Sequence, residues 1–180
     1  FIENIRISNE LTNHLLFSNY DLVINLSSVS VYSDLSVNYL NQNSLTIPTD
    51  NYGLSKLFSE EAINCVTQLN QKLKCIHFRL PGIIYKGSES IFIAKLIQKI
   101  KTGNTIIIRE KSKFNNATFI SDIAHSIIKI SEIPDLVKNS SIINFHSENE
   151  IYILDMIKHI SLKLKVPFPK VEYDDKIRNN

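Results

Sequence analysis

The sequence has 180 residues, a formal net charge of +2, 43% apolar residues and 21% charged residues, values near those of ordinary globular domains. This balance argues against a disordered chain, and the length suffices for one domain with a sizeable core. The lysines do not alternate with aromatic residues in a basic patch, and no signal peptide or membrane-length apolar run is visible, so neither nucleic-acid nor membrane binding is indicated.

The first elements expected along the chain are a helix and a buried strand. Apolar residues recur at a loosely helical period over residues 2–16, which predicts a helix. Residues 21–27 form a continuous apolar run, typical of a strand buried on both faces. Ser28 follows this strand. Because ligands of open α/β sheets gather beyond the carboxyl ends of the strands, Ser28 is a candidate site residue.

A polar loop over residues 34–50 is expected to cover the site, and a helix follows it. We predict this helix from Tyr52 to Leu69, with Asn51 as its N-cap. Its apolar residues form a broad helical stripe made of Leu54, Leu57, Phe58, Ala62, Cys65, Val66 and Leu69. Together with Cys75, Cys65 is expected to be a buried free thiol in a reducing compartment.

Tyr52 and Lys56 lie four residues apart, so the predicted helix places them on one face. An ammonium beside a phenol favours the phenolate. Since the reference pKa of tyrosine is about 10, proton transfer near neutral pH requires a drop of roughly three units, or about 4 kcal/mol. A second positive charge, such as an oxidised nicotinamide ring, would help. With Ser28 on the same substrate oxygen, these residues would form a proton-relay site for alcohol and ketone chemistry.

The rest of the chain is expected to alternate strands and helices. His77 lies inside a predicted strand and is interpreted as a core histidine. None of the histidines shows metal-ligand spacing, and no metal is predicted. The expected elements are a buried strand over 74–80, a helix over 91–100, a short strand over 105–108, a helix after Phe119 capped by Asp122, a strand over 141–146, an amphipathic helix over 151–164 and an extended segment over 166–173.

Four ordered motifs carry a family resemblance: SSVSVY, YGLSK, HFRLPGIIY and FISDIAHSI. In this order and spacing the chain resembles the extended short-chain dehydrogenase/reductase family, the NAD-dependent epimerases and dehydratases. The resemblance implies an NAD or NADP cofactor, a nucleotide-sugar substrate and a homodimer in the cytoplasm. By this resemblance the catalytic residues are Ser28, Tyr52 and Lys56, the substrate-binding residues are Ser28, Ser30 and Tyr52, and the cofactor-binding residues are Leu26, Ser27, Tyr52, Lys56, Pro81, Gly82 and Ile83.

The chain has only four glycines, and none forms the glycine-rich turn that such a fold places after its first strand. We therefore expect an incomplete Rossmann-like, doubly wound parallel sheet that lacks its N-terminal βαβ units. Residues 1–180 would be the C-terminal part of one domain. Within it, 1–85 would carry the catalytic motif, and 86–180 would form mostly a small substrate-binding lobe with returning Rossmann elements.

Departures from the family pattern narrow the expected reaction. Dehydratases of this family carry Asp and Glu after the catalytic hydroxyl residue, where this chain has Val29 and Ser30, so dehydration is disfavoured. Asn115 and Asn116 replace a phosphate-binding Arg-Asp pair. The remaining possibilities are a C4 epimerase or a keto-sugar reductase, with a role in polysaccharide synthesis suggested by composition. The alternatives are a non-catalytic NAD(P)-binding or scaffold member, or an inactive fragment.

Overall fold

The computed structural model describes residues 1–32, 40–87, 92–109, 112–114, 117–146 and 151–174. The chain folds into two compact units. The first comprises Phe1–Pro81 and Thr118–Phe145, and the second comprises Gly82–Ala117 and His146–Asn180.

A parallel sheet with the strand order β1-β2-β7 forms the centre of the first unit. Its strands are β1 (Leu22–Ser28), β2 (Lys74–Leu80) and β7 (Ser140–Asn144). At the carboxyl end, Ser28 is in register with Leu80, and Ser27 with Arg79. The α/β class with a parallel sheet, predicted from the sequence, is confirmed.

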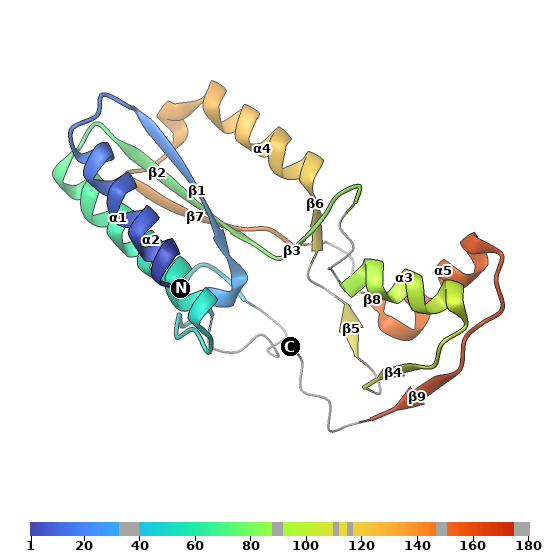
Figure 1. The fold of residues 1–180 in the computed structure, drawn as a ribbon. Helices are drawn as coiled ribbons and strands as arrows, with labels where there is room; N and C mark the ends of the chain where they lie inside the picture. Colours follow the sequence, from blue (N-terminus) through green and yellow to red (C-terminus); the bar gives the residue numbers. More distant parts are fainter. Residues whose placement is uncertain (33–39, 88–91, 110–111, 115–116, 147–150, 175–180) are drawn as a thin grey trace. The chain divides into compact units, whose positions relative to one another are not determined.

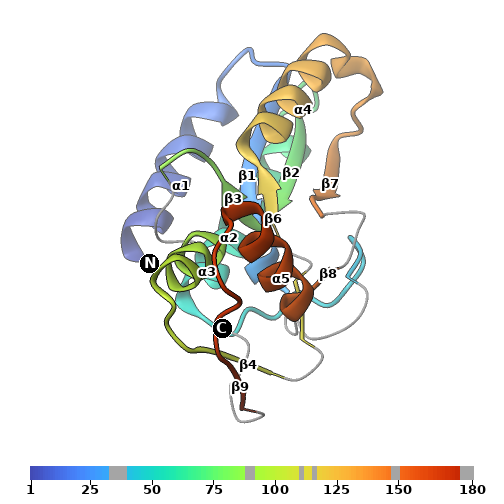
Figure 2. The same ribbon diagram turned by 90° about the vertical axis from the view of Figure 1, so that its right-hand side faces the viewer.

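Helices cover this sheet on both faces. Figure 1 shows α1 (Ile2–Leu16) and α2 (Asn51–Leu69) along one face and α4 (Ile120–Glu132) on the other, and the turned view in Figure 2 has α4 in front of β1 and β2. Between the sheet and the first pair of helices lies a buried apolar cluster of Leu15, Ile63, Val66, Leu73 and Cys75. A short 3-10 turn, η1 (Val29–Val31), follows β1, and a second, η2 (Pro134–Leu136), follows α4.

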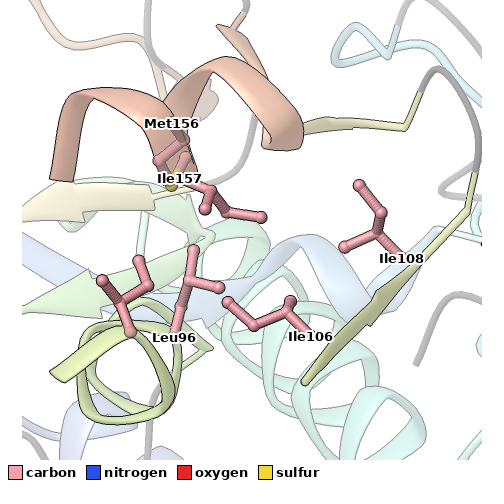
Figure 3. Close-up of a cluster of buried hydrophobic side chains, with 6 residues drawn as sticks. Leu96, Ile106, Ile108, Met156 and Ile157 are labelled. Carbon is pink, nitrogen blue, oxygen red and sulfur yellow. The ribbon is translucent and has the colours of Figure 1, made fainter. Parts of the chain in front are cut away.

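The second unit packs two helices and several short strands around one core. Its helices are α3 (Phe92–Thr102) and α5 (Ile153–Leu164). Side chains from both helices meet those of β4 (Ile106–Ile108) in the cluster drawn in Figure 3, which contains Leu96, Ile106 and Ile157. Its other strands are β3 (Gly82–Ile84), β5 (Lys113–Phe114), β8 (Ile151–Tyr152) and β9 (Val171–Tyr173), of which β9 pairs with β4 and β8 with β5. The short strand β6 (Ala117–Phe119) lies where the chain passes from the second unit back to the first.

Two predicted helix caps were wrong. Asp50, not Asn51, is the N-cap of α2, and its carboxylate accepts a 2.6 Å hydrogen bond from the Gly53 amide. The α4 helix begins two residues before Asp122, which lies in its first turn, and its N-cap Phe119 has no capping side chain. Of the polar loop expected over residues 34–50, residues 34–39 lie outside the part of the chain that the structure describes.

The expected burial of Cys65 was wrong, because this residue is exposed on α2. Of the apolar stripe, Val66 is buried, whereas Leu54, Phe58 and Leu69 are exposed. Small and polar residues make up much of the buried face of the helix, which carries Gly53, Ser55, Ser59, Glu60, Ile63, Val66 and Thr67. Cys75 is buried as expected, and both cysteines are free. No described helix combines the length and apolar character needed to cross a bilayer.

Candidate functional site

Ser28 ends β1 and begins the turn that carries Ser30. The Ser28 hydroxyl is buried, accepts a 3.2 Å hydrogen bond from the Ser30 amide and donates one of 3.2 Å to the Ser30 hydroxyl. The serine thereby caps η1 and fixes its own position at the carboxyl end of the sheet. This is the place at which the sequence predicted a functional hydroxyl.

Tyr52 and Lys56 occupy successive turns at the start of α2. The Tyr52 side chain is 50% exposed, as a group that meets a substrate must be. The Lys56 ammonium lies 5.8 Å from the centre of the Tyr52 ring and donates a 2.9 Å hydrogen bond to the Leu26 carbonyl oxygen. The predicted helical pairing of Tyr52 with Lys56 is therefore present, and Lys56 is held at the end of β1.

Partial burial changes the acid-base chemistry of Lys56. Removal of water from the ammonium lowers the pKa of Lys56. A charge in such a setting acts more strongly on its neighbours than one in bulk water, because the local dielectric constant is lower. Lys56 is thus suited to bias a neighbouring phenol electrostatically.

Gly53 allows α2 to approach the turn after β1. A Cβ atom built on Gly53 would lie 2.1 Å from the Ser30 carbonyl oxygen and 2.9 Å from the Pro48 Cβ. No side chain fits at such distances without a backbone shift. The glycine next to Tyr52 therefore sets how close the start of α2 comes to η1, and with it the separation of Tyr52 from the Ser28 turn.

A buried ion pair that was not predicted from the sequence joins α2 to β2. Glu60 and Arg79 are 1% and 3% exposed, and the guanidinium Nε and Nη2 donate to the two carboxylate oxygens at 3.0 and 2.7 Å. Ser27 donates a third hydrogen bond, of 2.5 Å, to the same carboxylate. Although burial opposes its ionisation, the hydrogen bonds to Glu60 raise the pKa of Arg79.

Two sequence signals could have revealed this pair. Arg79 lies near the end of a strand whose residues from Cys75 to Leu80 are all buried, and a buried charge requires a partner. Glu60 follows Lys56 by four residues, so both lie on one face of the helix. The loss of one partner would leave the other charge buried and unpaired, a change that typically costs about 3–5 kcal/mol.

Tyr32 connects this ion pair to the end of η1. Its ring centre lies 4.8 Å from the Arg79 Cζ atom, and its hydroxyl donates to Asn144 Oδ1 at 2.7 Å. Arg79 Nη1 is buried and has no hydrogen-bond partner among the described residues, and the π face of Tyr32 offers the guanidinium an alternative contact.

The other predicted cofactor-binding residues divide between the two units. Leu26 and Ser27 lie at the end of β1, and Pro81 follows Leu80, the register partner of Ser28. Ser27 lies within the strand, as expected, and its hydroxyl donates a hydrogen bond to Glu60. Gly82 and Ile83 belong to β3 in the second unit, so their role in cofactor binding stays a prediction, and Asn115 and Asn116 lie outside the described residues.

His77 is a core residue, as predicted. The ring is fully buried between two amide side chains, with Nδ1 3.0 Å from Asn25 Nδ2 and Nε2 2.9 Å from Asn64 Oδ1. Burial lowers the pKa of His77 to about 4 and raises that of the Cys75 thiol to about 12. In the described part of the chain, no three His, Cys, Asp or Glu side chains are grouped so that they could hold a metal ion.

Solved structures of nucleotide-sugar enzymes share this fold. UDP-glucuronic acid 4-epimerase from Bacillus cereus, in complex with NAD, superposes with a TM-score of 0.80 at 20% identity over 94% of this chain and 56% of its own. MoeE5 with UDP-glucuronic acid and NAD gives 0.78 at 18% identity over 95% and 57%. The UDP-Glc/GlcNAc 4-epimerase from Campylobacter jejuni gives 0.78 at 17% identity over 98% and 58%.

The chain spans somewhat more than half the length of these structures, so the expected partial Rossmann-like fold is confirmed. None of the curated proteins compared matches the sequence at a significant level. The model of the NAD dependent epimerase/dehydratase family matches residues 1–145, which confirms the resemblance recognised in the motifs. The chain therefore belongs to the NAD dependent epimerase/dehydratase family.

Proposed function

We propose that the complete protein containing this chain catalyses reversible oxidation of a sugar hydroxyl, as a nucleotide-sugar C4 epimerase or a keto-sugar reductase. One observation carries the proposal. Lys56 donates a hydrogen bond to the Leu26 carbonyl near the carboxyl end of β1. Lys56 lies one helical turn after Tyr52, and Leu26 lies two residues before Ser28, so this bond brings an acid-base group, a cation and a hydroxyl to the carboxyl end of the strand.

The residues present fit a nicotinamide cofactor. The carboxyl ends of β1 and β2 lie in register, and Leu26, Ser27 and Pro81 belong to those ends. With its other donors, the Lys56 ammonium would hold ribose hydroxyls, and Tyr52 would lie beside the ring. A bound nicotinamide ring accepts or returns a hydride at its C4 carbon.

The side chains of this chain would move the proton that accompanies the hydride. In the oxidation direction, the Tyr52 phenolate takes the proton of the sugar hydroxyl, and in the reduction direction Tyr52 returns a proton to the carbonyl oxygen. Ser28 donates a hydrogen bond to that oxygen and holds it in place, while Lys56 favours the phenolate electrostatically. All three side chains would act at the carboxyl end of β1.

The neighbourhood of Ser28 favours simple oxidation and reduction. Val29 and Ser30 follow it, and neither side chain can serve as the acid that expels water or as the base that abstracts a carbon-bound proton. Two of the structural neighbours described above are 4-epimerases, and MoeE5 binds UDP-glucuronic acid. These observations favour C4 epimerisation of a UDP-sugar over net reduction.

Three further parts of the proposal concern the whole protein. The second unit would serve as the substrate-binding lobe. The protein would act as a homodimer, because α2 leaves Leu54, Phe58 and Leu69 exposed on its outer face. A cytoplasmic location and a role in polysaccharide synthesis would follow from a nucleotide-sugar substrate.

The test is an assay of the complete gene product with NAD and UDP-glucose or UDP-glucuronic acid. An epimerase interconverts the two C4 epimers without net change in NADH absorbance, whereas a keto-sugar reductase working in reverse forms one NADH per sugar hydroxyl oxidised. A protein that binds NAD tightly but converts no sugar would instead support the non-catalytic alternative. A protein that neither binds NAD nor converts a sugar would contradict the proposal.

A further inference from the structure

The α2 helix is attached to the end of β1 in two successive turns. Lys56 donates to the main chain of Leu26 at 2.9 Å, and Glu60, one turn later, accepts from the side chain of Ser27 at 2.5 Å. Two attachments at neighbouring points of both elements fix the rotation of the helix about its axis as well as its distance from the strand. Tyr52 lies one turn before Lys56, so its direction depends on that rotation.

Arg79 extends the same connection to the neighbouring strand. It is the register partner of Ser27, and it donates through Nε to the carboxylate oxygen that Ser27 also contacts. Its second bond, from Nη2, holds the other oxygen, so the carboxylate cannot turn without losing a charge-assisted hydrogen bond. The planar fork of arginine suits this double contact, and a lysine would not reproduce it.

The guanidinium also reaches the far end of the Ser28 turn. Tyr32 closes η1, and its ring lies 4.8 Å from the Arg79 Cζ atom. Ser27 lies immediately before the turn and Tyr32 immediately after it. One buried ion pair therefore contacts the residues on both sides of the segment that carries Ser28 and Ser30.

We infer that Glu60 and Arg79 are positioning residues, which hold the Ser28 turn and the first turns of α2 in the arrangement required for proton transfer. The inference rests on the proposed function. Neither residue touches substrate or cofactor in this account, because both are almost completely buried. Their effect passes through Ser27 to Ser28, through Tyr32 to η1, and along α2 to Tyr52.

If the Glu60-Arg79 pair only stabilised the fold, its loss would affect kcat no more than the loss of another contact between α2 and the sheet. Asn64 offers a matched control for this comparison. Asn64 lies one turn after Glu60 on the same helix and also contacts the sheet, since it accepts hydrogen bonds from Ser140 Oγ at 2.7 Å and pairs with His77 Nε2 at 2.9 Å. These contacts lie away from the end of β1. Asn64→Ala therefore removes two contacts between the same helix and the sheet without touching the segment of Ser28.

The experiment compares Glu60→Gln, Ser27→Ala and Asn64→Ala in the complete protein, well below their unfolding temperatures. Glu60→Gln is expected to lower kcat by roughly 100-fold, the loss typical of a misplaced catalytic group, with little change in KM. Ser27→Ala removes one hydrogen bond, keeps the ion pair and should lower kcat less. Asn64→Ala should lower the unfolding temperature and leave kcat unchanged. Combined with Tyr52→Phe, Glu60→Gln should add little further loss of kcat.

Wild-type kcat in a folded Glu60→Gln protein would overturn the inference, as would an equal loss of kcat in Asn64→Ala. If Glu60→Gln fails to fold, Ser27→Ala decides by the same criterion. A Tyr52→Phe protein with wild-type turnover would contradict the proposed function. In that case, amide hydrogen exchange over residues 26–32 tests separately whether Glu60 and Arg79 position the Ser28 turn. Faster exchange in Glu60→Gln than in Asn64→Ala supports it, and equal exchange contradicts it.

Discussion

Lys56 and Leu26 are joined by a 2.9 Å hydrogen bond from the ammonium to the main-chain carbonyl, which brings a cation on α2 to the carboxyl end of β1. The bond uses one of the three donors of the ammonium and leaves two for other partners. It also directs the Lys56 side chain toward the sheet, close to the first turn of α2, which contains Tyr52. In the proposed mechanism, this hydrogen bond is what holds the Tyr52-Lys56 pair beside the carboxyl end of β1.

Lys56→Met should separate catalysis from folding. The loss of the hydrogen bond to Leu26 costs about 1 kcal/mol, and relief from holding a partly buried ammonium offsets part of that cost. We expect the free energy of unfolding to change by less than about 1 kcal/mol while turnover falls by roughly 100-fold or more. Urea unfolding and steady-state kinetics of the complete protein check the two halves. A variant that keeps its turnover would contradict the role assigned to Lys56.

Gly53→Ala should destabilise the protein although alanine is the better helix former. Helix propensity alone would make the substitution favourable by roughly 1 kcal/mol. The added Cβ would instead meet the Ser30 carbonyl oxygen at 2.1 Å, which forces η1 and α2 apart. We expect a net loss of about 1–3 kcal/mol and a lower kcat. Asn51→Ala, an exposed residue of the same helical turn, is the control and should change neither; a stabilised Gly53→Ala protein would refute the close approach.

Sequence reasoning predicted the main elements and the motif residues because these depend on local pattern. The apolar runs of β1 and β2, and the four-residue spacing of Tyr52 and Lys56, are visible without a structure. The motifs also identified the family correctly. What the pattern specified was the order of the elements and the chemistry of a few side chains.

The errors and omissions came from contacts between elements. The local pattern of α2 did not show that Glu60 would be buried with Arg79 of β2, or that Ser55 would accept a hydrogen bond from Asn4 of α1. Such pairing joins residues far apart in the sequence and has no periodic signal. The errors at the caps of α2 and α4, of one and three residues, are of a different kind, since the local pattern specifies the ends of a helix less sharply than its existence.

The stability of the protein should fall in weak acid because of His77. Burial lowers its pKa from 6.5 to about 4, so the unfolded chain binds a proton between these values and the folded chain does not. Stability is therefore lost as the pH falls from about 6.5 to about 4, by up to roughly 3 kcal/mol from this residue.

The check is urea unfolding of the wild-type protein and of His77→Gln at pH 7 and pH 4.5. Glutamine does not titrate, so the variant should lose less stability between the two pH values than the wild type does. His125→Gln, on the exposed part of α4, is the control and should behave like the wild type. The same pH dependence in wild type and His77→Gln would show that His77 is protonated in the folded protein.

The exposed apolar residues of α2 should mediate dimer formation in the complete protein. Phe58 is 37% exposed, and Leu54 is exposed one turn before it. Phe58→Glu places a charge on that face and should shift the protein to a monomer, as measured by light scattering. Ile128→Glu makes the same change at an exposed residue of α4 and should leave the dimer intact. A wild-type protein that is monomeric at micromolar concentration would contradict the prediction.

The most direct test of the account is turnover of the complete protein carrying Tyr52→Phe, measured beside NAD binding. The substitution removes a single oxygen from a half-exposed side chain, so the fold should be unaffected. We predict a loss of turnover of at least about 100-fold, the contribution expected of an acid-base group, with the affinity for NAD nearly unchanged. Wild-type turnover in this variant would contradict the assignment of Tyr52 and, with it, the proposed site.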